Sequence, residues 1–178
     1  ADFSRFHVLS HDLCLKHHMG PSHPESPERL AAVEEALRRS PLWSEGLLRP
    51  GREASREEIA QAHDHRYVDQ IFSQAPSAGF VQLDADTSMN PFSLSAARRA
   101  VGCVLSGVDL IMRHGVERVF CAVRPPGHHA EYDQAMGFCL FNNVAVGVRY
   151  ALEHFDLKRV AVIDFDVHHG NGTEDILQ

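Results

Sequence analysis

The chain has 178 residues, a length that suits a single domain. Its 44% hydrophobic and 23% charged residues are ordinary for a globular protein. With 17 basic and 24 acidic residues the formal net charge is −7, which disfavours a broad nucleic-acid surface because such a surface needs clustered positive charge. No apolar run approaches the ~20 residues that span a membrane, and the N-terminus lacks the basic-then-apolar pattern of a signal peptide.

The four cysteines show no CxxC pairing, and three of them lie in apolar sequence. We therefore predict reduced packing residues of a cytoplasmic protein rather than metal ligands. Histidine is more informative, because 13 residues of this type are many for the length. They cluster at positions 17–18, 63–65, 128–129 and 168–169, which favours metal binding or acid–base chemistry.

The N-terminal part predicts a short strand near Phe6–Leu9, followed by a loop rich in His, Pro and Ser. Ser26 followed by Pro27 is typical of a helix start, since a cap residue precedes a proline at the first helical position. This helix should stop at Ser40, because Pro41 disfavours helical geometry in the residue before it.

Two short helical pieces, Glu57–Ala62 and Tyr67–Phe72, precede a long loop over residues 74–93. Loops of this length in compact domains are often functional. The clearest helix follows, since the apolar residues of Leu94–Met112 fit a helical stripe and Gly115 can end it.

The last third of the chain predicts an apolar strand at Val119–Val123, a helix at Phe141–Phe155 and a buried strand at Val160–Ile163. Strand, helix, strand in this order is typical of an α/β protein with a parallel sheet. Such sheets bind ligands beyond the C-terminal ends of their strands. Polar motifs at 124–130 and 164–172 each follow a strand directly, so we expect them to meet at one site.

The run VAVIDFDVHHGNG alternates Asp164, Asp166 and His168. In an extended chain, side chains at i, i+2 and i+4 point to one side, so a carboxylate and an imidazole there are plausible ligands for a divalent metal. Asp164 is also expected to be a buried acid held by backbone N–H groups. His169 falls on the other side of the alternation and is expected to pack. A solvated loop is the alternative for Asp166 and His168.

The run RPPGHHA places His128 and His129 after the preceding predicted strand. Imidazole titrates near neutral pH, so two histidines there suit general acid–base work. Each would need an orienting partner on its second nitrogen, and Asp164 and Asn171 are the right residue types. A pair of surface or structural histidines is the alternative.

Weaker candidates lie elsewhere in the chain. Phe138 could line a substrate channel, although a residue in such apolar sequence is more often core. Asp84 and Asp86 are loop acids that are either solvated or placed at a pocket rim, where they could bind a substrate backbone N–H. The pair His63-Asp64 occurs in some metal phosphohydrolases, but alone it favours a structural role.

The segments RPPGHHA, GFCLFNNVAV and VAVIDFDVHHGNGTEDI together resemble the zinc-dependent histone deacetylase family. HPESPERL and LDADT also look like it, so the resemblance covers essentially the whole chain. The family includes bacterial histone deacetylase-like amidohydrolases and acetylpolyamine amidohydrolases. The resemblance implies a three-layer α/β fold of the arginase/deacetylase type with a central parallel sheet, truncated here. Residues 1–178 would form the N-terminal part of a single deacetylase domain.

By this resemblance, Asp166 and His168 match two of the three protein ligands to a catalytic Zn2+. His129 would act as general base and then as general acid, and His128 would be an electrostatic partner paired with Asp164. The third zinc ligand, an aspartate, and the transition-state tyrosine have no match in the chain. We therefore expect this polypeptide to be inactive alone, with the C-terminal remainder of the domain as its partner.

The resemblance also implies substrate contacts by Gly137, Phe138 and the rim aspartate Asp84, with Asp86 possible because the loop alignment is loose. Asn171 stands where class I enzymes have aspartate, and the sequence HHGNGT looks like the class II branch and its bacterial relatives. Asparagine cannot carry the negative charge that raises the basicity of a neighbouring histidine. A K+ ion is implied at three backbone carbonyls, those of Asp164, Asp166 and His168.

The implied activity is hydrolysis of an acetyl-lysine peptide or protein, an acetylated polyamine or another small amide to acetate and a free amine. Two other classes stay open. One is a non-catalytic pseudoenzyme or interaction module that keeps the fold. The other is an arginase-like ureohydrolase, which needs two metals and more Asp ligands and does not fit the tandem histidines. No direct nucleic-acid or membrane partner is expected.

Overall fold

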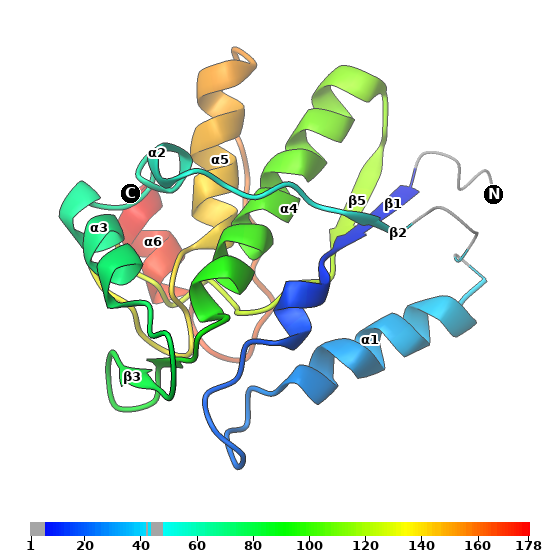
Figure 1. Cartoon of the computed structure of the whole chain (residues 1–178). Coiled ribbons are helices and arrows are strands. Elements are labelled where there is room, and N and C mark those ends of the chain that lie inside the picture. Colours follow the sequence, from blue (N-terminus) through cyan, green and yellow to red (C-terminus); the bar gives the residue numbers. More distant parts are fainter. Residues whose placement is uncertain (1–5, 42, 44–47) are drawn as a thin grey trace.

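A three-stranded parallel sheet forms one end of the molecule in the computed structural model (Figure 1). β1 (Phe6–Ser10) lies between β2 (Leu48–Pro50) and β5 (Arg118–Cys121). Both neighbours run parallel to β1, and Phe120 of β5 stands opposite Val8. This confirms the parallel sheet expected from the order of the predicted elements. The structure describes residues 6–41, 43 and 48–178.

Helices cover both faces of this sheet. Leu30 of α1 (Pro27–Arg39) packs with Val8 in a small apolar cluster on one face. Neighbouring residues of a strand point to opposite faces, so His7 points away from the face that Val8 covers. Val119 of β5 stands opposite His7 and shares its face. There it lies against α4 (Ser93–His114), the longest helix. The three layers are therefore helix, sheet and helix.

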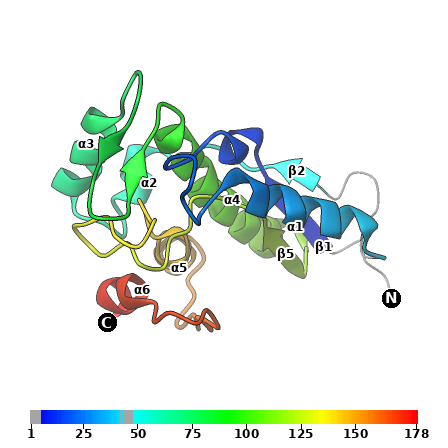
Figure 2. The same cartoon turned by 90° about the horizontal axis from the view of Figure 1, so that it is seen from below.

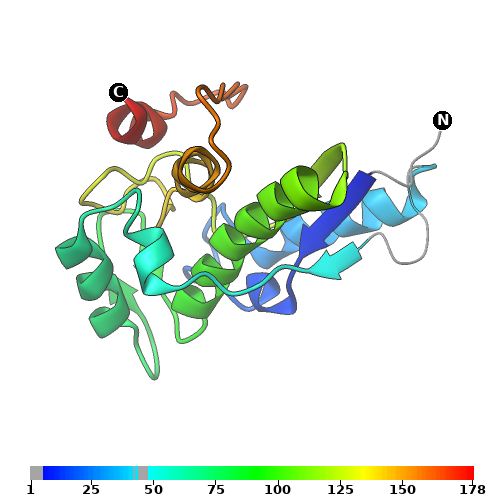
Figure 3. The same cartoon turned by 90° about the horizontal axis from the view of Figure 1, so that it is seen from above.

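The larger apolar core lies away from the sheet, where residues of α4 form one cluster with residues of α3 (His65–Gln74), α5 (Asn143–His154) and α6 (Asn171–Leu177). α5 lies between α4 and the C-terminal helix α6 (Figures 2 and 3). Close packing of α5 on α4 requires Gly147, where a Cβ would lie 2.5 Å from Cγ1 of Val104. The part of the chain that the structure describes has no helix both long and apolar enough to cross a membrane. The other helices are η1 (Asp12–Leu15) and α2 (Arg56–Ile59).

The helix ends predicted from capping residues are confirmed. α1 begins at Pro27 after Ser26 and ends before Ser40. α4 ends at Gly115, whose φ of 69° places it in the left-handed region that favours glycine.

The long loop over residues 74–93 contains a short antiparallel hairpin that the sequence analysis missed. β3 (Val81–Gln82) pairs with β4 (Ser88–Met89). Asp84 closes the turn, because its Oδ1 accepts the backbone N–H of Thr87 at 2.7 Å. A polar side chain that binds the backbone two or three residues further along the chain can form such a turn. This turn leaves no periodic pattern of apolar residues in the sequence.

The buried strand predicted at Val160–Ile163 is wrong for the described structure. This segment pairs with no strand, and Ile163 is 86% exposed. Just beyond it, Phe165 and Val167 are 96% and 92% exposed. A strand needs a hydrogen-bonded neighbour and a covering layer on its apolar face. The rest of the described chain supplies neither to this segment.

The His63-Asp64 pair is structural, as the sequence analysis favoured. His63 is buried, donates through Nδ1 to the carbonyl of Glu131 at 2.9 Å, and accepts through Nε2 the backbone N–H of Asn142 at 2.9 Å. Asp64 caps α3 by accepting the N–H of Arg66. Because one ring nitrogen donates and the other accepts, His63 must be neutral, and burial lowers its pKa to about 4.

This burial makes the stability pH-dependent. Unfolded His63 takes up a proton below its ordinary pKa of 6.5, whereas the folded residue does so only near 4. The unfolded state therefore binds more protons in this window, and the free energy of unfolding falls by roughly 1.4 kcal/mol for each pH unit that is lost. Urea unfolding at about pH 7 and pH 5 measures this change. Between these pH values, we expect the free energy of unfolding of His63→Gln to fall by about 2 kcal/mol less than that of the parent. The exposed His18→Gln is the control, and equal losses in the parent and His63→Gln would contradict the assignment.

Candidate active site

The tandem histidines are each held by a different side chain from the segment at 164–171. Nδ1 of His128 lies 2.8 Å from Oδ2 of Asp164, and Nδ1 of His129 lies 2.6 Å from Oδ1 of Asn171. The two rings lie side by side, with centroids 4.0 Å apart. These are the pairs that the sequence analysis proposed, and the two motifs do meet at one site. The catalytic roles of the four residues stay predictions.

The backbone at the start of α6 holds the histidine loop in place. The carbonyl of His128 accepts the N–H groups of Gly172 and Thr173 at 3.0 and 3.2 Å. A Cβ at Gly170 would lie 2.5 Å from Oδ2 of Asp164. A Cβ at Gly172 would lie 2.1 Å from the carbonyl oxygen of Ala130. Gly172 therefore permits the close approach of the two motifs, and Gly170 leaves room for the Asp164 carboxylate beside His128.

Asp164 differs from the buried acid that was expected. Its side chain is one-third exposed, because the segment around it is uncovered in the described structure. The hydrogen bond to His128, and then the N–H of Asp166, holds the pKa of Asp164 below its usual range. His169 is also exposed rather than packed, and it pairs with Glu174 at 2.8 Å.

Asp166 and His168 lie in contact with each other. Oδ1 of Asp166 is 3.4 Å from Nδ1 of His168. Two ligands at ~2.1 Å from a tetrahedral zinc ion lie about 3.4 Å apart, so these two atoms fit one zinc. The backbone N–H of His168 is the main cause of a lowered pKa of Asp166, which keeps this carboxylate charged. The described residues contain no group of three or more His, Cys, Asp or Glu side chains that could hold a metal.

A cavity of about 500 Å³ brings most of the predicted site together. The predicted acid–base pair, both proposed zinc ligands and two proposed substrate contacts line it. These residues are His128, His129, Asp166, His168, Gly137 and Phe138.

Asp84 does not line this cavity, whereas Asp86 does. The Asp84 carboxylate instead binds the backbone N–H groups of Asp86 and Thr87 in the hairpin turn. The Thr87 hydroxyl in turn accepts the N–H of Phe138 at 3.0 Å, so the hairpin is tied to the cavity wall. The geometry therefore favours Asp86, the alternative that the sequence analysis left open, as the rim acid.

Gly137 and Phe138 both have a positive φ, of 55° and 70°. A Cβ at Gly137 would lie 2.5 Å from Cδ2 of His129. The backbone of Phe138 is strained, because residues other than glycine rarely adopt a left-handed conformation. The Phe138 ring packs edge-on against that of His23, with the ring centroids 4.6 Å apart. This turn thus places glycine against the histidine ring and an aromatic ring in the cavity wall.

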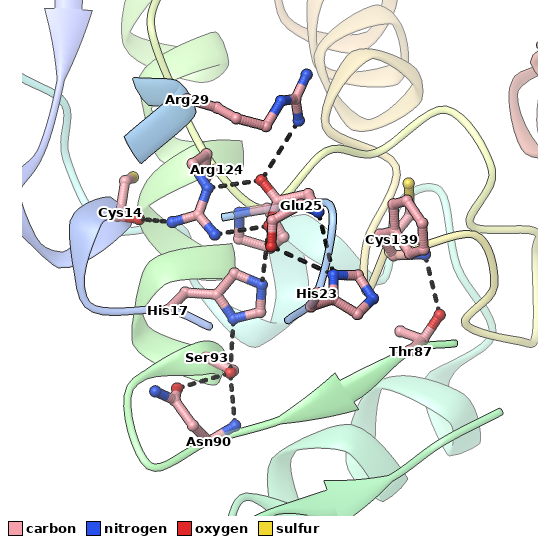
Figure 4. Close-up of polar contacts among 12 residues, drawn as sticks. Cys14, His17, His23, Glu25, Arg29, Thr87, Asn90, Ser93, Arg124 and Cys139 are labelled. Atoms are coloured by element: carbon pink, nitrogen blue, oxygen red, sulfur yellow. Dashed lines mark hydrogen bonds and ion pairs between the residues drawn. The ribbon is translucent and has the colours of Figure 1, made fainter. Parts of the chain in front are cut away.

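A buried ion pair that sequence reasoning missed anchors the histidine loop from behind. Nε and Nη2 of Arg124 donate to the two carboxylate oxygens of Glu25 at 2.6 Å each, and Nη1 donates to the carbonyl of Cys14 at 2.6 Å. Glu25 lies at the centre of the contacts in Figure 4 and also lines the cavity. His17 lies 3.7 Å from the same carboxylate, and burial lowers its pKa to about 3. No local pattern links two residues 99 positions apart.

Two arginines contact Glu25 and provide a matched test. The Arg124 side chain is 4% exposed, whereas that of Arg29, 3.6 Å from the same carboxylate, is 64% exposed. Arg124→Ala leaves a buried carboxylate without its main partner, so we expect a loss of about 3–5 kcal/mol in unfolding free energy. Arg29→Ala should cost less than about 1 kcal/mol, since water screens an exposed pair. Equal effects in chemical denaturation would contradict this account.

Gly137→Ala should destabilise more than Gly79→Ala. Both glycines have a positive φ, but a Cβ at Gly79 meets nothing within 4 Å. Gly79→Ala therefore reports the cost of a left-handed alanine, about 1–2 kcal/mol. Gly137→Ala adds the collision with the His129 ring, which should raise the loss by a further ~1–3 kcal/mol. Thermal and urea unfolding measure both, and equal losses would show that the ring moves away freely.

Comparison with known proteins agrees with this geometry. Residues 23–178 match the family model of the histone deacetylase domain, and the chain belongs to this family. An uncharacterized protein of Synechocystis is 44% identical over 90% of this chain and 53% of its own length. A histone deacetylase-like amidohydrolase of Pseudomonas aeruginosa is 35% identical over 93% of this chain and 48% of its own length.

The crystal structure of the HDA15 HD domain has the same fold, with a TM-score of 0.90 at 35% identity over 98% of this chain and 50% of that chain. The fold is thus the α/β fold of the arginase/deacetylase type with a central parallel sheet. A polyamine deacetylase, HDAC10 of Danio rerio, is 37% identical over 84% of this chain and 23% of its own length. The chain spans about half the length of the Synechocystis and Pseudomonas relatives.

Proposed function

We propose that the protein is a zinc-dependent amidohydrolase that removes acetyl groups from acetyl-lysine or acetylated amines. One observation carries the proposal. His128 and His129, each hydrogen-bonded through Nδ1, share a cavity with Asp166 and His168, whose ligand atoms have the spacing of a zinc site. Groups for proton transfer and for metal binding thus lie around one space.

Asp166 and His168 would hold the zinc together with one further ligand, because a catalytic zinc site normally has three protein ligands. When zinc is bound, it would polarise the acetyl carbonyl and lower the pKa of the attacking water. Since the described residues bring two such ligands together, residues 1–178 are proposed to be inactive without the remainder of the domain. A K+ ion is proposed at three backbone carbonyls, those of Asp164, Asp166 and His168.

The two histidines have separate roles in this proposal. His129 takes a proton from the attacking water and gives it to the leaving amine, and Asn171 orients its ring. His128 stays paired with Asp164, and its ring faces the same cavity. In this proposal His128 stabilises the negative charge that develops on the substrate oxygen.

The cavity wall suits a substrate with a linear aliphatic arm. Gly137 and Phe138 line the cavity beside His129 and would contact such an arm. Asp86, or Asp84 from the same turn, would accept an N–H group of the substrate at the rim. An acetyl-lysine side chain and an acetylated polyamine share this chemistry.

The exposed segment 160–167 is the surface that we propose for the remainder of the domain. Its backbone pairs with no strand in the described structure, and Ile163, Phe165 and Val167 present apolar side chains to solvent. An exposed apolar segment that pairs with no strand gains hydrogen bonds and burial when a further strand or helix packs on it. The relatives are about twice the length of this chain, which supports such an occupant.

The test uses protein that carries the complete domain. We expect one zinc per chain and release of acetate from an acetyl-lysine peptide or an acetylpolyamine, lost on chelation and restored by zinc. Asp166→Ala and His168→Ala should lose both zinc and activity. His129→Ala should keep the zinc and lose about 10²–10⁴-fold in kcat.

Other outcomes separate the rival classes. Two manganese ions per chain would indicate a ureohydrolase of the arginase type, and binding of acetylated ligand without turnover would favour a non-catalytic module. Rapid turnover by residues 1–178 alone would refute the proposed need for a further zinc ligand.

A further inference from the structure

The amide of Asn171 bridges two groups of opposite hydrogen-bonding character. Its Oδ1 lies 2.6 Å from Nδ1 of His129, and its Nδ2 donates to Oε1 of Glu131 at 2.8 Å. Nδ2 also lies 3.1 Å from Sδ of Met136. A carboxylate and a thioether can only accept, so chemistry alone requires the NH2 end of Asn171 to face Glu131. Its carbonyl end must then face His129.

This orientation decides which nitrogen of His129 carries the proton. A carbonyl oxygen can only accept, so Nδ1 of His129 must be the N–H donor of the neutral ring. Nε2 then keeps its lone pair and can act as a base. If the amide of Asn171 turned over, its NH2 would face Nδ1, and the proton of the neutral ring would move to Nε2. The ring would then lose its basic nitrogen on the substrate side.

We propose that Glu131 is a positioning residue that locks the amide of Asn171 and through it the tautomer of His129. This inference rests on the proposed deacetylase function for its catalytic consequence, but not for its structural content. Glu131 thereby supplies a carboxylate that is one hydrogen bond removed from the ring of His129. His128 differs, because Asp164 contacts its Nδ1 directly.

Glu131 is itself held from several sides, as a positioning residue must be. Its carbonyl accepts from the buried His63 at 2.9 Å, and its N–H donates to the carbonyl of Gln134 at 3.0 Å. Nε2 of Gln134 donates to Oε2 of Glu131, the carboxylate oxygen that Asn171 leaves free. Both oxygens of the carboxylate are therefore engaged. A chain of contacts runs from the core at His63 to the ring of His129.

The test reads the tautomer directly. In protein with 15N-labelled histidine at about pH 8, where a histidine of ordinary pKa is neutral, long-range 1H–15N correlations distinguish Nδ1–H from Nε2–H. We expect His129 to be Nδ1–H in the parent. Glu131→Gln should populate Nε2–H, because a glutamine can accept from the NH2 end of the Asn171 amide or donate to its carbonyl end. The control Glu174→Gln removes a charge from the exposed acid that pairs with His169 and should leave His129 unchanged.

A second variant keeps the idea falsifiable if Glu131→Gln perturbs folding. In the double variant Glu131→Gln/Asn171→Asp, the new carboxylate accepts from His129 whichever way it turns, so Nδ1–H should return. A parent ring in the Nε2–H form, or an unchanged tautomer in Glu131→Gln, would overturn the proposal. In the active protein, Glu131→Gln should lower kcat by about 10–100-fold with KM little changed. The expected tautomers in a protein without acetyl-hydrolase activity would refute the proposed function alone.

Discussion

The buried ion pair of Arg124 and Glu25 joins the two parts of the molecule on which the cavity depends. Arg124 lies three residues after the end of β5 and four residues before His128, while Glu25 belongs to the loop that leads into α1. Both partners are almost fully buried, so the pair is costly to form and still more costly to break. Its main physical effect is to fix the direction in which the histidine loop leaves the sheet.

The histidine loop is also held by close contact between its backbone and the backbone at the start of α6. Glycines stand where the histidine loop meets the segment at 164–172. A Cβ at Gly172 would collide with the backbone of that loop, and a Cβ at Gly170 would collide with the Asp164 carboxylate that binds His128. Because the side chains are absent, the amides at the start of α6 can reach the carbonyl of His128. The two polar motifs are thus fitted together by steric requirements as well as by the hydrogen bonds between their side chains.

The two histidines receive different electrostatic support despite being adjacent. His128 has a carboxylate in direct contact, whereas His129 has an amide that is backed by a carboxylate. A carboxylate orients its ring and places a negative charge beside it, whereas an amide orients its ring without an adjacent charge. The two rings therefore differ in whether a negative charge lies in direct contact with Nδ1.

Much of the fold and part of the site could be predicted from the sequence. Local capping chemistry gave the ends of α1 and α4, and the order of the elements gave the parallel sheet. The alternation of Asp166 and His168 indicated that their side chains lie together, and Oδ1 of Asp166 lies 3.4 Å from Nδ1 of His168. Their role as metal ligands stays a prediction. The strand at Val160–Ile163 failed because an apolar pattern predicts burial only where a neighbour exists to cover it.

The sequence by itself determined which chemistry-bearing residues the protein holds, since motif composition and spacing are local properties. Only the tertiary structure decided their partners. It joined Arg124 to Glu25 across 99 positions and put Asp86 rather than Asp84 in the cavity wall. It also put Glu131 behind Asn171. These contacts depend on the packing of distant segments, which no local pattern encodes.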